Sequence, residues 1–260
     1  MKDVASETDD RGIPIDRVGI RDLHLPVRIM EKNGGYARVV GEVEASVRLP
    51  HVQRGTHMSR FLNILGAWSK QAVSMVEMEQ TLRQIVENFD APAAHVELQF
   101  KYFLSKKAPI SGQESQLDYD CSFEGAIVND EFSFILGCKV PIITLCPCSK
   151  EISEYGAHSQ RALLSVRIAC NTGRILWLED LIPLLEAQGS CDIFPLLKRP
   201  DEKYVTETSY ENPRFVEDVV RETIIALRDI DTVSGASAEC ESFESIHNHT
   251  AYAYAEWGDL

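Results

Sequence analysis

In the segment HVELQFKYFL, residues 95–104, an apolar side chain stands at every second position from Val96 to Leu104. Because successive side chains of a β-strand point to opposite faces, this alternation predicts a strand with one buried face. The later stretch 117–128 has the pattern expected of its hairpin partner. This part of the chain is therefore predicted to form antiparallel sheet.

Strand and helix patterns continue on both sides of the hairpin. Before it, residues 38–49 alternate as a strand, and two apolar stripes at helical spacing follow over 61–68 and 75–89. After it, strand patterns occupy 132–145, 164–170, the residues around Cys240 and 251–257. Between these, one helix is predicted near 179–188 and another from an Asn212 N-cap with Pro213 at its first helical position.

The order of strands, two helices and strands thus occurs twice, which predicts an α+β protein with mainly antiparallel sheets. We expect a flexible tail over residues 1–16, where large apolar side chains are few. A first half over 17–130 and a second half over 131–260 would follow and form one compact unit.

The composition is globular, with 44% hydrophobic and 25% charged residues among 260 and a net charge of −14. This charge disfavours nonspecific binding to DNA or RNA. No apolar stretch approaches the ~20 residues that span a membrane, and the polar, acidic start lacks the order of a signal peptide. Seven unevenly spaced cysteines are an odd number, which predicts reduced thiols in a cytoplasmic protein.

The segment with the most chemistry runs from Cys146 to Arg161. It holds two thiols, Cys146 and Cys148, one imidazole, His158, and two cations, Lys150 and Arg161. Thiolate sulfur and imidazole nitrogen are the ligands of zinc and similar divalent ions. Incidental or buried cysteines at a strand end fit the same spacing, so the pattern alone leaves both interpretations open.

Four further segments carry candidate groups, each with a simpler interpretation. Glu202 lies in a charged, turn-like segment before a strand-like 204–206, where a solvated loop charge is the default. Glu217 stands off the apolar stripe of its helix, where an ion pair with Arg221 is the default. His247 and His249 are two residues apart in a stretch predicted to be extended, so their side chains face the same side. They fit metal ligands or proton-transfer groups, and simple exposure is the default. Arg54 and Arg60 flank a helix start that suits phosphate.

Together these segments resemble the type IB GTP cyclohydrolases, the FolE2 family. The resemblance covers nearly the whole chain beyond the tail, and it is carried by the strings RGTHMSRF (54–61), LCPCSKEISEYGAHSQR (145–161), LLKRPDEKYVTE (196–207), YENPRFVEDVVRE (210–222) and FESIHNHTAYA (243–253). It implies a tunnelling fold, with tandem β2α2β2 halves that form barrels on oligomerisation. It further implies a homotetramer with active sites at subunit interfaces.

The resemblance also implies an activity, which is hydrolysis of GTP to 7,8-dihydroneopterin triphosphate and formate at the start of folate (pterin) biosynthesis. A divalent metal (Mn, Zn or Fe(II)) held by Cys146, His158 and Glu202 would activate water, with Cys148 competing for the thiolate position. Glu217 would bind the guanine edge, and His247 would transfer protons. Four cationic side chains would be the candidates for binding the triphosphate: Lys150, Arg161, Arg54 and Arg60.

The sequence leaves three alternative functions open. Another tunnelling-fold enzyme, such as a nitrile reductase acting on a deazapurine, would use a cysteine nucleophile and a reduced nicotinamide without a metal. A related cyclohydrolase would end at a cyclic phosphate. A noncatalytic, metal-stabilised binding module would unfold when Cys146 is replaced by alanine.

Overall fold

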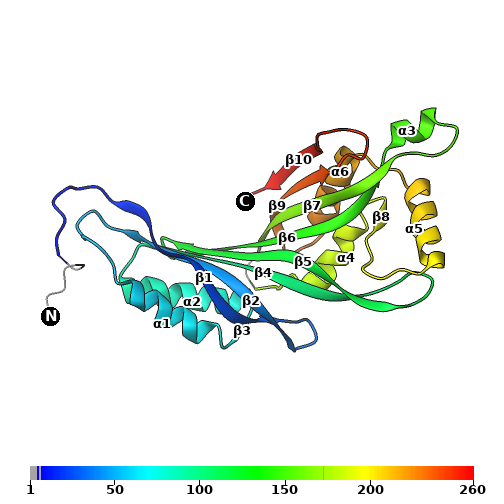
Figure 1. The fold of residues 1–260 in the computed structure, drawn as a ribbon. Helices are drawn as coiled ribbons and strands as arrows, with labels where there is room; N and C mark the ends of the chain where they lie inside the picture. Colours follow the sequence, from blue (N-terminus) through cyan, green and yellow to red (C-terminus); the bar gives the residue numbers. More distant parts are fainter. Residues whose placement is uncertain (1–4, 6, 172) are drawn as a thin grey trace. The chain divides into compact units, whose positions relative to one another are not determined.

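The computed structural model describes residue 5 and residues 7–171 and 173–260. Contacts divide the chain into two units, and Figure 1 shows their elements. Unit 1 comprises Met1–Lys101 and Ser122–Leu136, and unit 2 comprises Tyr102–Cys121 and Gly137–Leu260. Three strands run through both units: β4 (Ala93–Lys107), β5 (Glu114–Val128) and β6 (Glu131–Leu145). The boundary predicted between residues 130 and 131 falls in the turn from β5 to β6.

Unit 1 is a sheet covered by two helices. Its strands follow the order β3-β1-β2-β4-β5-β6, in which β1 (Ile15–Met30) and β2 (Tyr36–Leu49) form an antiparallel hairpin and β3 (Ala72–Val73) runs parallel to β1. Helices α1 (Met58–Trp68) and α2 (Met75–Phe89) lie side by side on one face (Figure 1). Both predicted helical stripes are confirmed, and their buried members include Phe61, Leu65, Met78 and Ile85.

The contact between α2 and β5 depends on a glycine. A Cβ built on Gly125 would lie 2.6 Å from Met78 Cγ and 2.8 Å from Leu82 Cδ1. Both distances are shorter than real side-chain contacts, so the helix packs directly on the strand backbone at this point. The start of α2 is fixed separately, because the Ser74 hydroxyl accepts from Val76 N at 3.2 Å while Ser74 N donates to Glu77 Oε2 at 2.9 Å.

Unit 2 contains the strand order β4-β5-β6-β7-β9-β10, and β8 (Cys191–Asp192) pairs with β6. The remaining strands are β7 (Ser159–Cys170), β9 (Val233–Ser242) and β10 (Ala251–Gly258). Its helices are α3 (Pro147–Ile152), α4 (Leu178–Glu186), α5 (Arg199–Glu211) and α6 (Val216–Arg228). The apolar side of α6, with Val219, Val220 and Leu227, is buried and contacts β9 and β10.

Three local predictions were wrong. Residues 204–206 are helical within α5, not strand-like, and Asp201 N-terminal to them caps that helix by accepting from Lys198 N at 2.8 Å. Asn212 does not cap α6. Its side chain donates to Gly189 O at 3.1 Å, and α6 begins after Phe215, whose N–H donates to Asp218 Oδ2 at 3.0 Å.

The third error concerns His247 and His249, which lie in a loop of bends between β9 and β10 and not in an extended stretch. In extended backbone, side chains two residues apart lie on the same face of the strand, and this is why the two rings were expected on one side. Here the loop itself stacks them, with ring centroids 5.0 Å apart.

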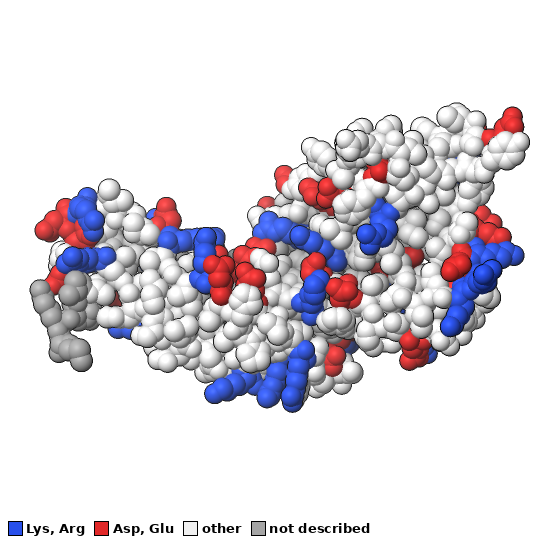
Figure 2. Space-filling model, in the orientation of Figure 1, with Lys and Arg blue, Asp and Glu red and all other residues white. Residues whose placement is uncertain are grey.

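The predicted tail falls partly on residues 1–4 and 6, which lie outside the described residues. Of the rest, Arg54 N donates to Glu7 O at 3.0 Å and Asp9 N to Val52 O at 3.0 Å. All seven cysteines are free thiols. On the face drawn in Figure 2, acidic and basic side chains are interspersed, so the net charge of −14 does not gather in one area of it. Among the described residues, no helix is long and apolar enough to cross a bilayer.

Candidate active site

A cavity of about 360 Å³ lies within unit 2, where the end of β6, the start of β7, the first turn of α6 and the loop from β9 to β10 meet. Its size is in the range of small-molecule sites. The lining residues with ionisable side chains are Cys146, His158, Arg214, Glu217, Glu244, His247, His249 and Tyr252. Four residues predicted from separate parts of the sequence are therefore brought together: Cys146, His158, Glu217 and His247.

Cys146 is placed by the transition from β6 to α3. It is the N-cap residue of α3, and Pro147 follows at the first helical position, where a fixed φ suits the helix. Cys146 Sγ accepts from Ser149 N at 3.4 Å, and Cys146 N donates to His158 O at 3.1 Å. Cys148 is exposed on the same short helix and does not line the cavity, so the structure separates the two thiols.

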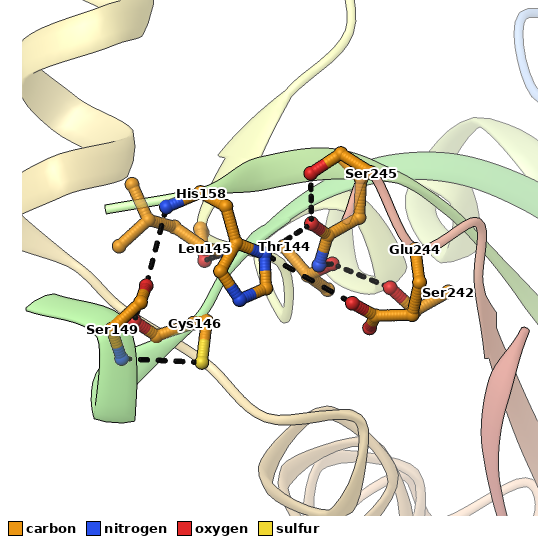
Figure 3. Close-up of polar contacts among 10 residues, drawn as sticks. Thr144, Leu145, Cys146, Ser149, His158, Ser242, Glu244 and Ser245 are labelled. Carbon is orange, nitrogen blue, oxygen red and sulfur yellow. Dashed lines mark hydrogen bonds and ion pairs between the residues drawn. The ribbon is translucent and has the colours of Figure 1, made fainter. Parts of the chain in front are cut away.

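His158 is held by a chain of polar contacts (Figure 3). Its Nδ1 lies 3.0 Å from Gln160 Oε1 and 3.9 Å from Glu244 Oε2. Gln160 Nε2 in turn donates to Thr144 Oγ1 at 3.2 Å, and this hydroxyl lies 3.1 Å from Ser242 Oγ. Thr144 and Ser242 are 2% and 1% exposed, so the chain ends in the interior between β6 and β9.

Glu217 and the histidine pair form another side of the cavity. Glu217 lies in the first turn of α6, where the helix dipole stabilises a negative charge. Arg221 pairs with Asp218 at 3.7 Å, in place of the expected pair with Glu217. Burial, and after it the charge of Glu217, raises the pKa of the Cys240 thiol on β9 to about 12. The His247 and His249 rings are nearly parallel, with an interplanar angle of 17°.

Besides Cys148, three predicted residues of unit 2 lie outside the cavity lining. Glu202 is exposed on α5. Lys150 Nζ lies 4.3 Å from the centroid of the Tyr210 ring and donates to Tyr210 O. Arg161 is exposed on β7 and follows Gln160, so it points to the opposite face of the strand.

The other two predicted cations belong to unit 1, whereas all the cavity residues belong to unit 2. Arg54 forms an ion pair with Glu7. Arg60 Nη1 donates to Asn88 O at 2.9 Å and lies over the Phe89 ring. Helix α1 begins after His57, whose side chain makes no capping hydrogen bond.

Sequence reasoning missed Arg214, Glu244 and Gln160 as lining residues. Each lies in the same family-like segment as a predicted site residue, so its closeness in sequence to that residue is the feature that could have identified it. Arg214 N donates to Leu145 O at 3.0 Å, which ties the start of α6 to the end of β6. Glu244 is 13% exposed at its side chain and faces His158.

The donor types suit a divalent ion, because a thiol, an imidazole and carboxylates line one cavity. Within the part of the chain that the structure describes, however, no three His, Cys, Asp or Glu side chains converge closely enough to hold one. Cys146 and His158 are the two predicted ligands in the cavity, and the third, Glu202, lies elsewhere on the surface.

The fold resembles that of solved uricases. Uricase from Arthrobacter globiformis matches with a TM-score of 0.60 and 11% identity, over 94% of this chain and 93% of that one. The fold is thus the tunnelling fold, in agreement with the expected α+β class and its mainly antiparallel sheet. At this identity the likeness concerns the fold alone.

The family follows from the sequence comparisons. The family described as type I GTP cyclohydrolase FolE2 matches residues 1–253. GTP cyclohydrolase FolE2 of Geotalea uraniireducens is 47% identical over 98% of this chain and 93% of its own length. The protein of the same name from Geobacter sulfurreducens is 45% identical over 98% of both chains. The chain belongs to the FolE2 family of type I GTP cyclohydrolases.

Proposed function

We propose that the chain hydrolyses GTP to 7,8-dihydroneopterin triphosphate and formate, the first step of folate biosynthesis, in the cytoplasm. The observation that carries this proposal is one cavity of about 360 Å³ lined by a thiol, three imidazoles, two carboxylates and a guanidinium. These groups can bind a purine edge, supply two of the ligands of an ion and move protons. The names of the relatives agree with this substrate.

Guanine recognition is assigned to Glu217. A carboxylate accepts two hydrogen bonds in one plane, which matches the N1–H and 2-amino donors of guanine. Adenine lacks this donor pair, so the same group discriminates between the two purines. Glu217 is suited to the role because it lines the cavity from the first turn of α6, and because Arg221 pairs with its neighbour Asp218.

Cys146 and His158 would hold the divalent ion, with Mn, Zn and Fe(II) all compatible with this donor set. When bound, the ion supplies Lewis-acid activation of a water for attack at C8 of the purine. Glu244 lies beside His158 in the same cavity, so its carboxylate is a further candidate ligand from the same chain. Glu202 would complete the set from another copy in a homotetramer, because it is exposed and lies outside its own cavity.

Proton transfer is assigned to His247, with His249 stacked against it. An imidazole nitrogen accepts and returns a proton near neutral pH, which opening of the purine ring requires. For the triphosphate, Arg214 is the guanidinium in the described cavity. Lys150, Arg161, Arg54 and Arg60 would act on a substrate held by another copy, because none of them lines the cavity of this chain.

The test is incubation of purified protein with GTP and Mn(II), with formate and oxidised pterin fluorescence as readouts. We expect both products, and we expect chelation to abolish them and added metal to restore them. Absence of formate with every divalent metal would overturn the proposal, and activity that survives chelation would overturn the metal's role.

Two matched variants assign the thiol. Cys146→Ala should abolish formate release while circular dichroism and assembly stay unchanged, whereas the exposed Cys148→Ala should keep metal binding. The opposite result would make Cys148 the ligand. Unfolding of Cys146→Ala would favour a metal-stabilised binding module over an enzyme.

A further inference from the structure

The Gln160 side chain lies between the His158 ring and the interior of unit 2. Its Nε2 donates to Thr144 Oγ1 at 3.2 Å, which directs its Oε1 toward His158 Nδ1 at 3.0 Å. Ser245 Oγ donates to the same oxygen at 3.4 Å. In this orientation Nε2 donates to Thr144 and Oε1 faces both Ser245 Oγ and His158 Nδ1. The reverse orientation would direct the amide NH2 at Nδ1 and leave the Glu244 carboxylate beside a ring nitrogen that carries no proton.

The groups that face His158 Nδ1 are both acceptors. An amide oxygen has no proton to donate, and an ionised carboxylate has none either. These are Gln160 Oε1 at 3.0 Å and Glu244 Oε2 at 3.9 Å. A proton on Nδ1 therefore completes the contact with Gln160, whereas a lone pair on Nδ1 would face the lone pairs of an oxygen.

We propose that Gln160 is a positioning residue that holds His158 in the tautomer protonated at Nδ1, so that Nε2 keeps a free lone pair. Figure 3 shows Nε2 on the ring edge that points toward the Cys146 sulfur. The lone pair is thus directed to the side of the cavity where the thiol lies. Histidines that bind metals commonly donate their other N–H to a fixed acceptor, and this acceptor sets tautomer and ring orientation.

The choice of a neutral amide has a chemical consequence. Gln160 fixes the ring without placing a second full charge beside it, whereas a carboxylate at the same position would compete as a ligand for a cation. The anchoring hydroxyls of Thr144 and Ser242 are buried and belong to β6 and β9, while Gln160 and His158 belong to or adjoin β7. The ring is therefore oriented by sheet strands, which are more rigid than the loop that carries His247.

The tautomer is measured directly by magic-angle-spinning NMR of the whole, metal-free protein labelled with ¹³C and ¹⁵N at histidine. His158 is assigned by the signal that disappears in His158→Gln. At a pH where the ring is neutral, we expect a protonated Nδ1 and an unprotonated Nε2. Gln160→Leu should shift His158 toward the Nε2-protonated form, which is the more stable tautomer of the free side chain, and Thr144→Val should shift it in the same direction by freeing the amide.

Two control variants keep the test decisive if Gln160→Leu perturbs folding. Gln160→Glu retains an acceptor and should retain the Nδ1-protonated form. Gln188→Leu makes the same change at an amide outside the cavity, one that donates to Leu184 O at 2.7 Å, and should leave His158 unchanged. An unprotonated Nδ1 in the unaltered protein, or the same tautomer in Gln160→Leu, would overturn the proposal.

Calorimetric titration with Mn(II) or Zn(II) supplies a second readout, which rests on the proposed function. Gln160→Leu should weaken the affinity by about 10- to 100-fold, the usual effect of losing such a partner, while Gln188→Leu should not. Failure of the unaltered protein to bind either ion, with the Nδ1 proton present, would refute the metal site and support the tautomer assignment. Equal metal affinities in the unaltered protein and Gln160→Leu would refute the role of Gln160 in binding.

Discussion

Replacing Lys106 with methionine should destabilise unit 2 strongly. Lys106 Nζ lies 2.7 Å from Glu186 Oε1 and 3.0 Å from Asp192 Oδ2, and the side chains of Lys106 and Glu186 are 10% and 6% exposed. Tyr119 donates to the same Glu186 oxygen at 2.7 Å. Burial raises the pKa of Glu186 and the bond from Lys106 opposes that rise. Without the cation, a carboxylate remains buried with one neutral donor.

The magnitude follows from that geometry. Removing one partner of a buried ion pair costs about 3–5 kcal/mol, because the other charge stays uncompensated. Methionine keeps the apolar stem, so little of this loss comes from packing. The loss should be largest at pH 8. A protonated Glu186 carries no charge, so the deficit should shrink as pH falls through the folded pKa of Glu186 in the variant, which loss of the cation raises further.

The assay is urea unfolding followed by circular dichroism at fixed protomer concentration, because assembly adds to apparent stability. Lys106→Met combined with Glu186→Gln should recover most of the loss, since the neutral amide no longer needs a cation. A loss below about 1 kcal/mol in the single variant would place the pair in the range of exposed ion pairs and refute the reasoning. So would a double variant no more stable than the single one.

Three other predictions concern the site and the core. Glu217→Gln should lower kcat/KM for GTP by roughly 10- to 100-fold, since a bidentate contact is worth about 1–3 kcal/mol, and an unchanged kcat/KM would remove Glu217 from guanine binding. Gly125→Ala should lower the free energy of unfolding by about 1–3 kcal/mol through overpacking against α2. Gly66→Ala, with open space at its Cβ in α1, should raise it by up to about 1 kcal/mol. Equal effects of the two variants in urea unfolding would contradict the packing argument. Iodoacetamide should modify the exposed Cys148 in the native protein but reach Cys240 only after unfolding, because Cys240 is buried and burial raises its pKa to about 12. Modification of Cys240 in the native protein, detected by mass spectrometry, would contradict its burial.

The sequence predicted the elements that have a clean period. Residues 96–104 alternate and form β4, and the stripes of α1 and α2 are buried as expected. Strand β1 was missed because register shifts between Ile15 and Val18 and between Ile20 and Leu23 break its alternation. Helix α5 was missed because its buried residues are polar, Asp201 and Ser209, so no apolar stripe marks it.

The candidate site was predicted in part for a related reason. Cys146 and His158 are close in sequence and carry ligand chemistry, so their segment could be recognised without the fold. Glu244 reaches the cavity through the pairing of β7 with β9, and Arg214 through a hydrogen bond from its N–H to Leu145 O at the end of β6. The sequence does not encode either contact locally. Asn212 shows the same limit, because its partner Gly189 O lies 23 residues away in the chain.

The carboxylate of Asp201 has a consequence for how this protein can vary. Burial alone would raise its pKa, but hydrogen bonds from Ser111, Lys198 and Ile110 hold the pKa well below its usual range. The tip of the β4–β5 hairpin is thereby clamped to the start of α5. Hairpin tips usually accept insertions freely, but a longer loop here would pull the beginning of α5 out of place, and Glu202 with it. The length of this turn is therefore tied to the position of the Asp201 carboxylate, 91 residues away from Ile110 in the chain.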